Sequence, residues 1–233
     1  MDKAELLKQL NNEEISCDES QLNLLMTLMN STLKQNEKFN LTAIKEEPVF
    51  VEKMIFDSAI ALRELDLTDK SIIDVGTGAG FPGMVIRILA KDANVTLLDS
   101  TKKKIDYLKE FALANNLKIN GVSERAEDYS RNHRKQYDYA TARAVASLSI
   151  LLEIIIPLLK VGGTFIALKG LGYEEEINDA KNAFKKLNCH VENVYDFELP
   201  ESKEKRAIIY IKKDKETSKK YPRQYSDIKK QTL

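Results

Sequence analysis

Hydrophobic residues change their spacing near residue 70 of this chain. Before that point they recur at intervals of three and four residues, which is the spacing of an amphipathic helix. The polar residues 18–20 form a cap-like start, and a second helical run follows Pro48. The hydrophobic positions of these two runs are Leu22, Leu25, Met26, Leu28, Met29, Leu33, Phe50, Met54, Ile55 and Ile60. We therefore expect residues 1–65 to form an N-terminal helical segment.

From Ser71 onward, short apolar runs alternate with helical patterns. The runs that predict strands are Ser71–Val75, Val95–Asp99, Val122–Arg125, Tyr139–Arg143, Thr164–Lys169, Val191–Phe197 and Ala207–Lys212. The helical patterns cover Gly83–Ala90, Lys103–Asn115, Ser147–Leu159 and Glu174–Leu187. The pair Gly162-Gly163 is expected to stop the third helix before the fifth strand. This alternation predicts a mostly parallel sheet with helices on both faces.

Residues 200–206, which join the last two predicted strands, are too few for a crossover helix. These strands are therefore expected to form an antiparallel hairpin at one edge of the sheet. The expected fold is α/β, with a doubly wound, mostly parallel, seven-stranded sheet over residues 66–213. The lysine-rich residues 214–233 are expected to form a basic C-terminal tail.

Composition limits the class of protein. Hydrophobic residues make up 43% of the 233 positions, as in a globular protein with a packed core. Cys17 and Cys189 are the two cysteines, too few for a disulfide framework or a zinc pattern. The N-terminus lacks a signal-peptide pattern, and the most apolar stretch, residues 150–159, is too short to span a bilayer. We expect a soluble cytoplasmic protein without a metal site.

Charge is balanced overall but unevenly distributed. Residues 1–70 hold 8 Lys/Arg and 14 Asp/Glu, whereas residues 200–233 hold 11 and 5. Such asymmetry is typical of a chain with a basic contact surface, for example for nucleic acid. A basic tail that merely improves solubility explains the same counts, so charge alone leaves both interpretations open.

The segment from Ile73 to Gly83 carries the strongest motif. An acid, Asp74, is followed by glycines at every second position: Gly76, Gly78 and Gly80. Glycines permit a sharp strand-to-helix turn and leave no Cβ between chain and ligand. The amides at the start of the next helix add a partial positive charge. This pattern is typical of a turn that binds S-adenosylmethionine (AdoMet), in the methyltransferase variant of the doubly wound fold.

Two other interpretations use the same glycines. Residues 78–83 also fit G-x-G-x-x-G, the dinucleotide fingerprint, which would predict NAD as the cofactor. The other interpretation is a tight strand-to-helix turn that binds no ligand. The acid before the first glycine and the third alternating glycine favour AdoMet.

Ligands of open α/β sheets bind outside the carboxyl ends of the strands. Asp99 ends the second predicted strand, where an acid can accept hydrogen bonds from both ribose hydroxyls of a cofactor. The same acid is in place to cap the helix that follows. Ala126 and Glu127 follow the third strand, where a backbone amide and a carboxylate can read the edge of an adenine. A surface helix that begins there is an equally good explanation.

Two cations follow the next strands. Arg143 lies in the apolar segment Ala140–Val145, where an unpaired charge is costly. Its guanidinium is suited to stacking on a base or pairing with a carboxylate, and a purely structural ion pair is the alternative. Lys169 ends the fifth strand, where it can hold a phosphate or extend its charge to solvent.

Missing motifs narrow the methylation chemistry. Residues 141–144 read Thr-Ala-Arg-Ala, not the Asn/Asp-Pro-Pro-aromatic segment used for exocyclic amines. Neither cysteine lies in a loop where it can act as the nucleophile that a pyrimidine carbon requires. Guanine N7 needs neither the amine-binding segment nor a nucleophilic cysteine, because it already presents an in-plane lone pair. The enzyme only has to align this lone pair with the methyl group of AdoMet. N7 methylation is therefore compatible with the motif set.

These residues resemble the bacterial 16S rRNA guanine-N7 methyltransferase family RsmG, also called glucose-inhibited division protein B. The similar segments run in order through nearly the whole chain. They are residues 39–44 (Phe-Asn-Leu-Thr-Ala-Ile), 56–58 (Phe-Asp-Ser), 74–83, 98–100 (Leu-Asp-Ser), 125–127 (Arg-Ala-Glu), 141–146 (Thr-Ala-Arg-Ala-Val-Ala), 167–170 (Ala-Leu-Lys-Gly) and 220–223 (Lys-Tyr-Pro-Arg). The arginine segment and the Asn-Leu-Thr segment are more specific than the glycine turn.

The resemblance implies methyl transfer from AdoMet to a guanine N7 in the 530 loop of 16S rRNA. The cofactor positions that it implies are Gly76, Phe81, Ala126, Glu127 and Arg143. It also implies that Asn40, Asp57 and Lys169 lie near the substrate, and we assign catalytic roles to Arg143, Lys169 and Asp57. The expected partner is 16S rRNA within the small ribosomal subunit or an assembly intermediate, with the enzyme a monomer.

The chain departs from the family pattern in two places. Met54 stands where members often have His, and residues 226–228 replace a common Gly-Thr-Pro. The first departure argues against a catalytic histidine there, and the second is expected to affect the tail alone. A small-molecule AdoMet methyltransferase and a non-catalytic AdoMet-sensing or RNA-binding module remain alternatives.

Overall fold

The computed structural model describes all residues, 1–233. Seven strands form one sheet in the order β3-β2-β1-β4-β5-β7-β6. The strands are β1 (Ser71–Val75), β2 (Asn94–Asp99), β3 (Asn120–Ser123), β4 (Tyr137–Arg143), β5 (Leu159–Lys169), β6 (Cys189–Glu198) and β7 (Lys205–Lys213). β1 to β5 are parallel, whereas β7 runs antiparallel to both β5 and β6. The predicted doubly wound sheet with an antiparallel edge hairpin is confirmed.

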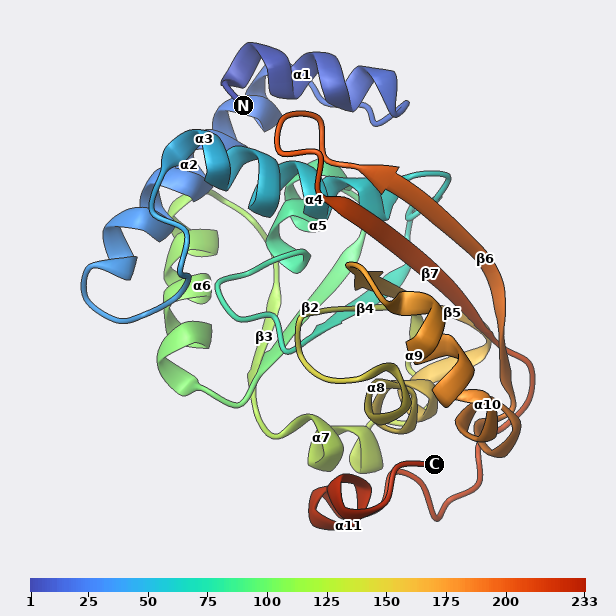
Figure 1. Cartoon of the computed structure of the whole chain (residues 1–233). Helices are drawn as coiled ribbons and strands as arrows, with labels where there is room; N and C mark the ends of the chain where they lie inside the picture. The colour runs from blue at the N-terminus through green and yellow to red at the C-terminus, as the bar shows by residue number, and fades with distance from the viewer.

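Helices cover both faces of the sheet and the N-terminal region (Figure 1). They are α1 (Lys3–Asn12), α2 (Glu19–Asn36), α3 (Glu47–Phe50), α4 (Asp57–Ala59), α5 (Gly83–Leu89), α6 (Lys102–Ala114), α7 (Ala126–Asn132), α8 (Leu148–Ile155), α9 (Tyr173–Asp179), α10 (Lys181–Leu187) and α11 (Tyr225–Lys230). A π-helix, η1 (Val51–Phe56), joins α3 to α4, and the 3₁₀ helices η2 (Ile60–Leu62) and η3 (Ile156–Leu158) follow α4 and α8. None of these helices has both the length and the apolar character needed to cross a membrane.

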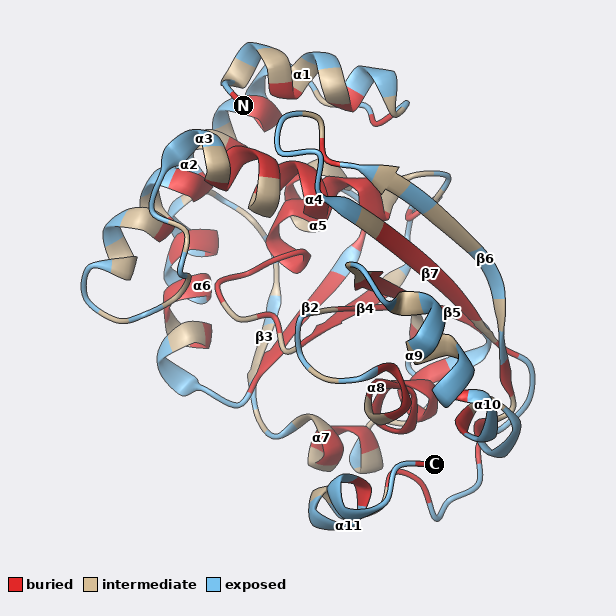
Figure 2. Cartoon of the chain, viewed as in Figure 1, coloured by how far each residue is buried: buried red, intermediate tan, exposed pale blue.

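Two hydrophobic cores lie on opposite faces of the sheet. Adjacent residues of a strand point to opposite faces, so Ile72 and Ile73 of β1 belong to different cores. The N-terminal helices, α5 and α6 build the first core, and α8, α10 and the C-terminal residues Tyr221 and Ile228 build the second. Buried residues concentrate along the central strands and the facing sides of the helices (Figure 2). The N-terminal helical segment is therefore packed against the sheet.

Four details differ from the sequence prediction. Gly162 and Gly163 lie inside β5, because the helix has already ended at Leu158 and Leu159 pairs with Tyr137 of β4. A Cβ at Gly163 would lie 2.9 Å from the carbonyl oxygen of Asp138, so close approach of the strands explains that glycine. The helix predicted over Glu174–Leu187 is two helices, α9 and α10. β3 begins two residues earlier than predicted, and α11 was not predicted; α7 agrees with the alternative of a helix that begins at Ala126.

Candidate active site

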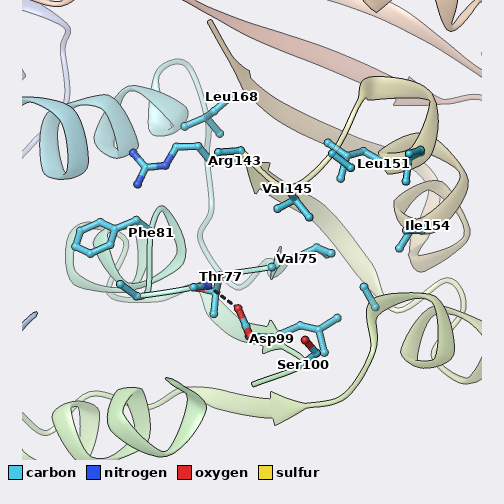
Figure 3. Close-up of a pocket in the computed structure, with 18 of the residues that line it drawn as sticks. Val75, Thr77, Phe81, Asp99, Ser100, Arg143, Val145, Leu151, Ile154 and Leu168 are labelled. Atoms are coloured by element: carbon cyan, nitrogen blue, oxygen red, sulfur yellow. Dashed lines mark hydrogen bonds between the residues drawn. The ribbon is translucent and has the colours of Figure 1, made fainter. Parts of the chain in front are cut away.

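A cavity of about 1130 Å³ opens at the carboxyl ends of the parallel strands. Its wall combines the β1–α5 turn, the ends of β2, β4 and β5, the start of α7, the loop before α3, and one residue of α11. Residues of η1, α4, α8, α9 and β7 also line it. Figure 3 shows Thr77 and Asp99 on one side and Arg143 and Leu168 on the other. The cavity lies where β1 stands between β2 and β4 and the chain order reverses, the usual ligand position in doubly wound sheets.

The glycine turn is held by hydrogen bonds from its own backbone. The amides of Gly76 and Thr77 donate to the carbonyl of Leu98 at 2.8 and 3.0 Å. The amide of Gly78 donates to Asp99 Oδ2 at 3.0 Å, as the dashed line in Figure 3 shows. The turn is therefore fixed before any ligand arrives, and these amides are already paired.

The three glycines of the turn lie in different surroundings. Gly76 has φ +73°, and a Cβ there would lie 2.7 Å from Val145 Cγ2. Gly78 has φ +58° and lines the cavity, and the nearest atom to a Cβ there would be the carbonyl oxygen of Gly76 at 3.9 Å, an ordinary contact distance. Gly80 is not part of the cavity wall, because it packs against Leu108 of α6. Gly78 thus leaves room for a ligand against the backbone.

Asp74 lies beneath the turn and outside the cavity wall. Its carboxylate accepts hydrogen bonds from the amide of Gly83 at 2.8 Å and from Thr141 Oγ1 at 3.1 Å. Burial raises the pKa of the Asp74 carboxyl, and its hydrogen-bond donors oppose that shift. Asp74 therefore ties β1, β4 and the start of α5 together. The amide of Gly83, at the start of α5, is occupied by this contact.

Asp99 lies in the wall at the end of β2. Besides the Gly78 amide, it accepts from the Thr101 amide at 2.8 Å, and Lys104 Nζ lies 3.8 Å away. The capping role considered from the sequence is not present, because the N-cap residue of α6 is Thr101 and no side chain caps that helix. A carboxylate has about four acceptor positions, so Asp99 retains capacity for ligand hydroxyls.

Ala126 and Glu127 line the cavity at the start of α7. Glu127 Oε1 accepts from Arg125 Nε at 3.0 Å, and Arg125 in turn lies over the ring of Tyr225, 4.9 Å from its centre. Sequence reasoning missed both Arg125 and Tyr225. Nothing in the sequence indicates that these two residues meet. Arg125 lies in a short segment before α7, and Tyr225 lies in the C-terminal residues that were expected to form a separate tail.

Arg143 is held by the N-terminal segment. Its Nη1 donates to the carbonyl of Lys53 at 2.9 Å and lies 3.4 Å from Asp57 Oδ2, while Nη2 lies 3.2 Å from the sulfur of Met54. Its guanidinium is also 5.8 Å from the centre of the Phe81 ring (Figure 3). The buried ion pair considered from the sequence is present, with Asp57 as the partner.

Asp57 bridges two guanidiniums. Its Oδ2 lies 3.5 Å from Arg206 Nε of β7 as well as near Arg143. Burial raises the pKa of the Asp57 carboxyl, and both arginines oppose that shift. The π-helix η1 supplies the Lys53 carbonyl and the Met54 sulfur immediately before Asp57, and π-helical turns are often found at functional sites.

Lys169 lines the cavity beside the end of β4. Its Nζ donates to the carbonyl of Ala146 at 3.0 Å and to Glu176 Oε2 at 2.7 Å. Glu176 also accepts from the amide of Leu148 at 2.7 Å. Lys169 and Glu176 together fix the loop between β4 and α8.

The other residues that the sequence analysis considered for the site lie at the margin of the cavity or outside it. Leu41 and Ile44 line the cavity, but Asn40 itself is exposed and outside the wall. Cys17 and Cys189 do not line it, and burial raises the pKa of their thiols to about 11 and about 12. No group of three or more His, Cys, Asp and Glu side chains is arranged to hold a metal ion.

Solved structures with a similar fold include M. jannaschii TYW2 in complex with AdoMet, with a TM-score of 0.58 and 14% identity. The match covers 73% of this chain and 79% of that one. A transferase from Pyrococcus horikoshii matches with a TM-score of 0.56 and 15% identity, over 72% of this chain and 64% of that one. At these identities the likeness shows the fold alone.

Relatives found by sequence have a much higher identity to this chain than these solved structures have. The Ribosomal RNA small subunit methyltransferase G of Fusobacterium nucleatum is 43% identical, with 90% of each chain covered. Its namesake from Halalkalibacterium halodurans is 38% identical, with 100% of each covered. The family model described as rRNA small subunit methyltransferase G matches residues 21–209. The protein is a methyltransferase that belongs to the rRNA small subunit methyltransferase G family.

Proposed function

We propose that this chain transfers a methyl group from AdoMet to N7 of a guanine in the 530 loop of bacterial 16S rRNA. The observation that carries the proposal is the cavity at the strand ends, where Gly78 leaves space against the backbone and Asp99 lies beside it. Membership of the family supports an RNA of the small subunit as the substrate.

The residues of the cavity fit AdoMet. Gly78 leaves open the space that a Cβ would fill, so a ligand can approach the backbone closely. Asp99 retains acceptor capacity for ribose hydroxyls. The backbone of Ala126 and the carboxylate of Glu127 suit the edge of an adenine. When bound, AdoMet supplies an electrophilic methyl group on its sulfonium.

Arg143, Lys169 and Asp57 are the residues that we assign to the substrate side. Guanine N7 carries an in-plane lone pair, so no residue has to remove a proton before the methyl group is transferred. The residues therefore need only hold the base in line, which is catalysis by positioning. Arg143 and Lys169 lie in the cavity wall as paired cations, and Asp57 is a positioning residue that orients Arg143.

RNA contact would use the cations around the cavity mouth and the basic C-terminal residues. Lys53, Lys104, Arg125 and Arg206 all line the cavity. Cations at phosphates make affinity fall steeply as salt rises. The target base must be exposed or flipped out to reach the methyl group, and a pre-exposed rRNA loop suits a chain without a separate RNA-binding module. The proposal includes a cytoplasmic monomer that acts on the small subunit or an assembly intermediate.

The test is to incubate the protein with labelled AdoMet and 30S subunits that lack rRNA modifications, then map the labelled nucleotide by mass spectrometry. The proposal predicts one N7-methylguanosine, in the 530 loop. Label on another nucleotide would overturn the assigned target. If 30S subunits take up no label, naked rRNA and earlier assembly particles are tried next, and failure with all of them would overturn the rRNA substrate.

Binding measurements separate the alternatives. Titration of AdoMet against NAD distinguishes a methyltransferase cofactor from a dinucleotide. A small-molecule methyltransferase would turn over a metabolite with little salt dependence. A sensor would bind AdoMet and yield no methylated product with any substrate.

A further inference from the structure

The C-terminal residues 214–233 are docked on the protein, and they reach the cavity. Glu153 of α8 is fully buried, and Arg223 is its charged partner. Arg223 donates to Glu153 through its amide at 2.9 Å, its Nε at 2.8 Å and its Nη2 at 2.7 Å. A buried carboxylate without a partner is costly, so this contact fixes the segment in one place.

Further hydrogen bonds hold the residues that precede and follow Arg223 in the sequence. Arg134 donates to the carbonyls of Tyr221 and Thr217 at 2.5 and 2.6 Å, and Arg131 donates to Gln224 Oε1 at 3.1 Å. Tyr221, Ile228 and Leu233 are buried in the same hydrophobic core as α8. Figure 1 shows α11 beside α7. This segment therefore has a defined structure and does more than add charge.

Tyr225, at the start of α11, forms part of the cavity wall together with Arg125, Ala126 and Glu127. The Arg125 guanidinium lies 4.9 Å from the centre of the Tyr225 ring and also pairs with Glu127. Ile150 and Ile154 of α8 contribute apolar side chains to the same wall. An aromatic ring, apolar side chains and a carboxylate whose charge is balanced by Arg125 suit a flat, uncharged heterocycle with hydrogen-bond donors on its edge.

We propose that Tyr225, held in place by the Arg223–Glu153 ion pair, forms one wall of the adenine end of the cofactor site. The C-terminal segment thereby acts as an affinity element for the cofactor. This inference rests on the proposed function, because it assigns the α7 end of the cavity to adenine. It deepens that proposal by adding a residue from a part of the chain outside the methyltransferase motifs.

The test is calorimetric titration of AdoMet and S-adenosylhomocysteine into the full-length protein and its variants. Tyr225→Leu removes the ring but keeps an apolar side chain for docking, and it should raise both dissociation constants about tenfold. Tyr225→Phe keeps the ring and should bind within about twofold of the wild type. Ser226→Ala, at the exposed neighbouring position on α11, is the matched control and should bind as the wild type does.

A further variant, Glu153→Gln, tests whether the Arg223–Glu153 ion pair anchors the C-terminal segment. Glu153→Gln should lower Tm and also weaken AdoMet binding, because Arg223 loses its charged partner and the position of Tyr225 is released. With 30S subunits as substrate, Tyr225→Leu should raise KM for AdoMet and leave kcat within about twofold, which a general loss of structure would not do.

The outcomes separate the two proposals. If the wild type does not bind AdoMet, the proposed cofactor is wrong and this inference falls with it. If the wild type binds AdoMet and Tyr225→Leu binds equally well, the inference alone is wrong. An unchanged affinity in Glu153→Gln together with a lower Tm would overturn the anchoring role of Arg223.

Discussion

Asp57 lies 3.4 Å from Arg143, although 86 residues separate them in the sequence. One residue belongs to the N-terminal helical segment and the other ends β4, so the contact joins these two parts of the chain at the cavity. Arg206 of β7 approaches the same carboxylate oxygen from the edge hairpin, at 3.5 Å. The position of Arg143 in the site therefore depends on residues from three separate parts of the chain.

Asp57→Asn should both destabilise the protein and slow methyl transfer. The substitution keeps the shape but removes the buried charge that two half-buried guanidiniums share, so we expect a loss of about 2 kcal/mol in the free energy of unfolding. Urea denaturation measures this loss. Asp69→Asn is the control, because Asp69 is exposed and its positive φ tolerates Asn. Equal stability of the two variants would show that the Asp57 pair contributes nothing.

Arg143→Ala should abolish methyl transfer while the fold survives. Asp57 keeps Arg206 as a charged partner in this variant, so the buried carboxylate is not left alone. We expect kcat to fall at least about 100-fold, because loss of positioning alone has effects of that size. Label transfer to 30S subunits measures the rate, and circular dichroism checks the fold. Turnover near the wild-type rate would remove Arg143 from the mechanism.

Gly78→Ala should weaken AdoMet binding by about tenfold or more, because the new Cβ would occupy the open space against the turn. Its positive φ also predicts a loss of about 1 kcal/mol in stability. Gly162→Ala is the matched control: Gly162 has φ +82° and nothing within 4 Å, but it lies in β5 away from the cavity. It should show the stability loss with unchanged affinity. If both variants bind AdoMet normally, the ligand does not approach Gly78.

Lys213 makes stability depend on pH in the alkaline range. Burial lowers the pKa of this lysine from 10.5 to about 8, and its Nζ donates to the carbonyls of Ile156 and Leu159. Between about pH 8 and 10.5 the unfolded chain binds more protons at this site, so its contribution to stability rises with pH and is smallest below about 8.

The measurement is Tm from pH 7 to 10 for the wild type and Lys213→Met, with the difference between the two curves isolating this lysine. We expect the wild type to gain stability relative to the variant as pH rises. Parallel curves would mean that the two carbonyls compensate the burial of the charged form.

The hydrophobic and polar pattern was sufficient to predict the sheet and the edge hairpin. A strand can be recognised from a short apolar run bounded by turn residues, and both signals lie in neighbouring positions of the sequence. The pattern also located Asp99, Ala126, Glu127, Arg143 and Lys169 on the cavity wall, because the carboxyl ends of parallel strands meet at one edge of a sheet. The sequence offers the helix α7 only as one of two alternatives, because its seven residues, Ala126–Asn132, have no hydrophobic periodicity. The glycine pair 162–163 was misread because glycine also permits close approach between strands.

The amino-acid sequence by itself determined the fold and the residues placed at the strand ends. Only the tertiary structure decided which groups meet there. Asp74 turns inward to Gly83 and Thr141, Asp57 pairs with Arg143, and Arg223 brings Tyr225 to the start of α7. The physical reason is that strand and helix patterns follow from neighbouring residues, whereas a buried charge must find its partner wherever the packed chain provides one.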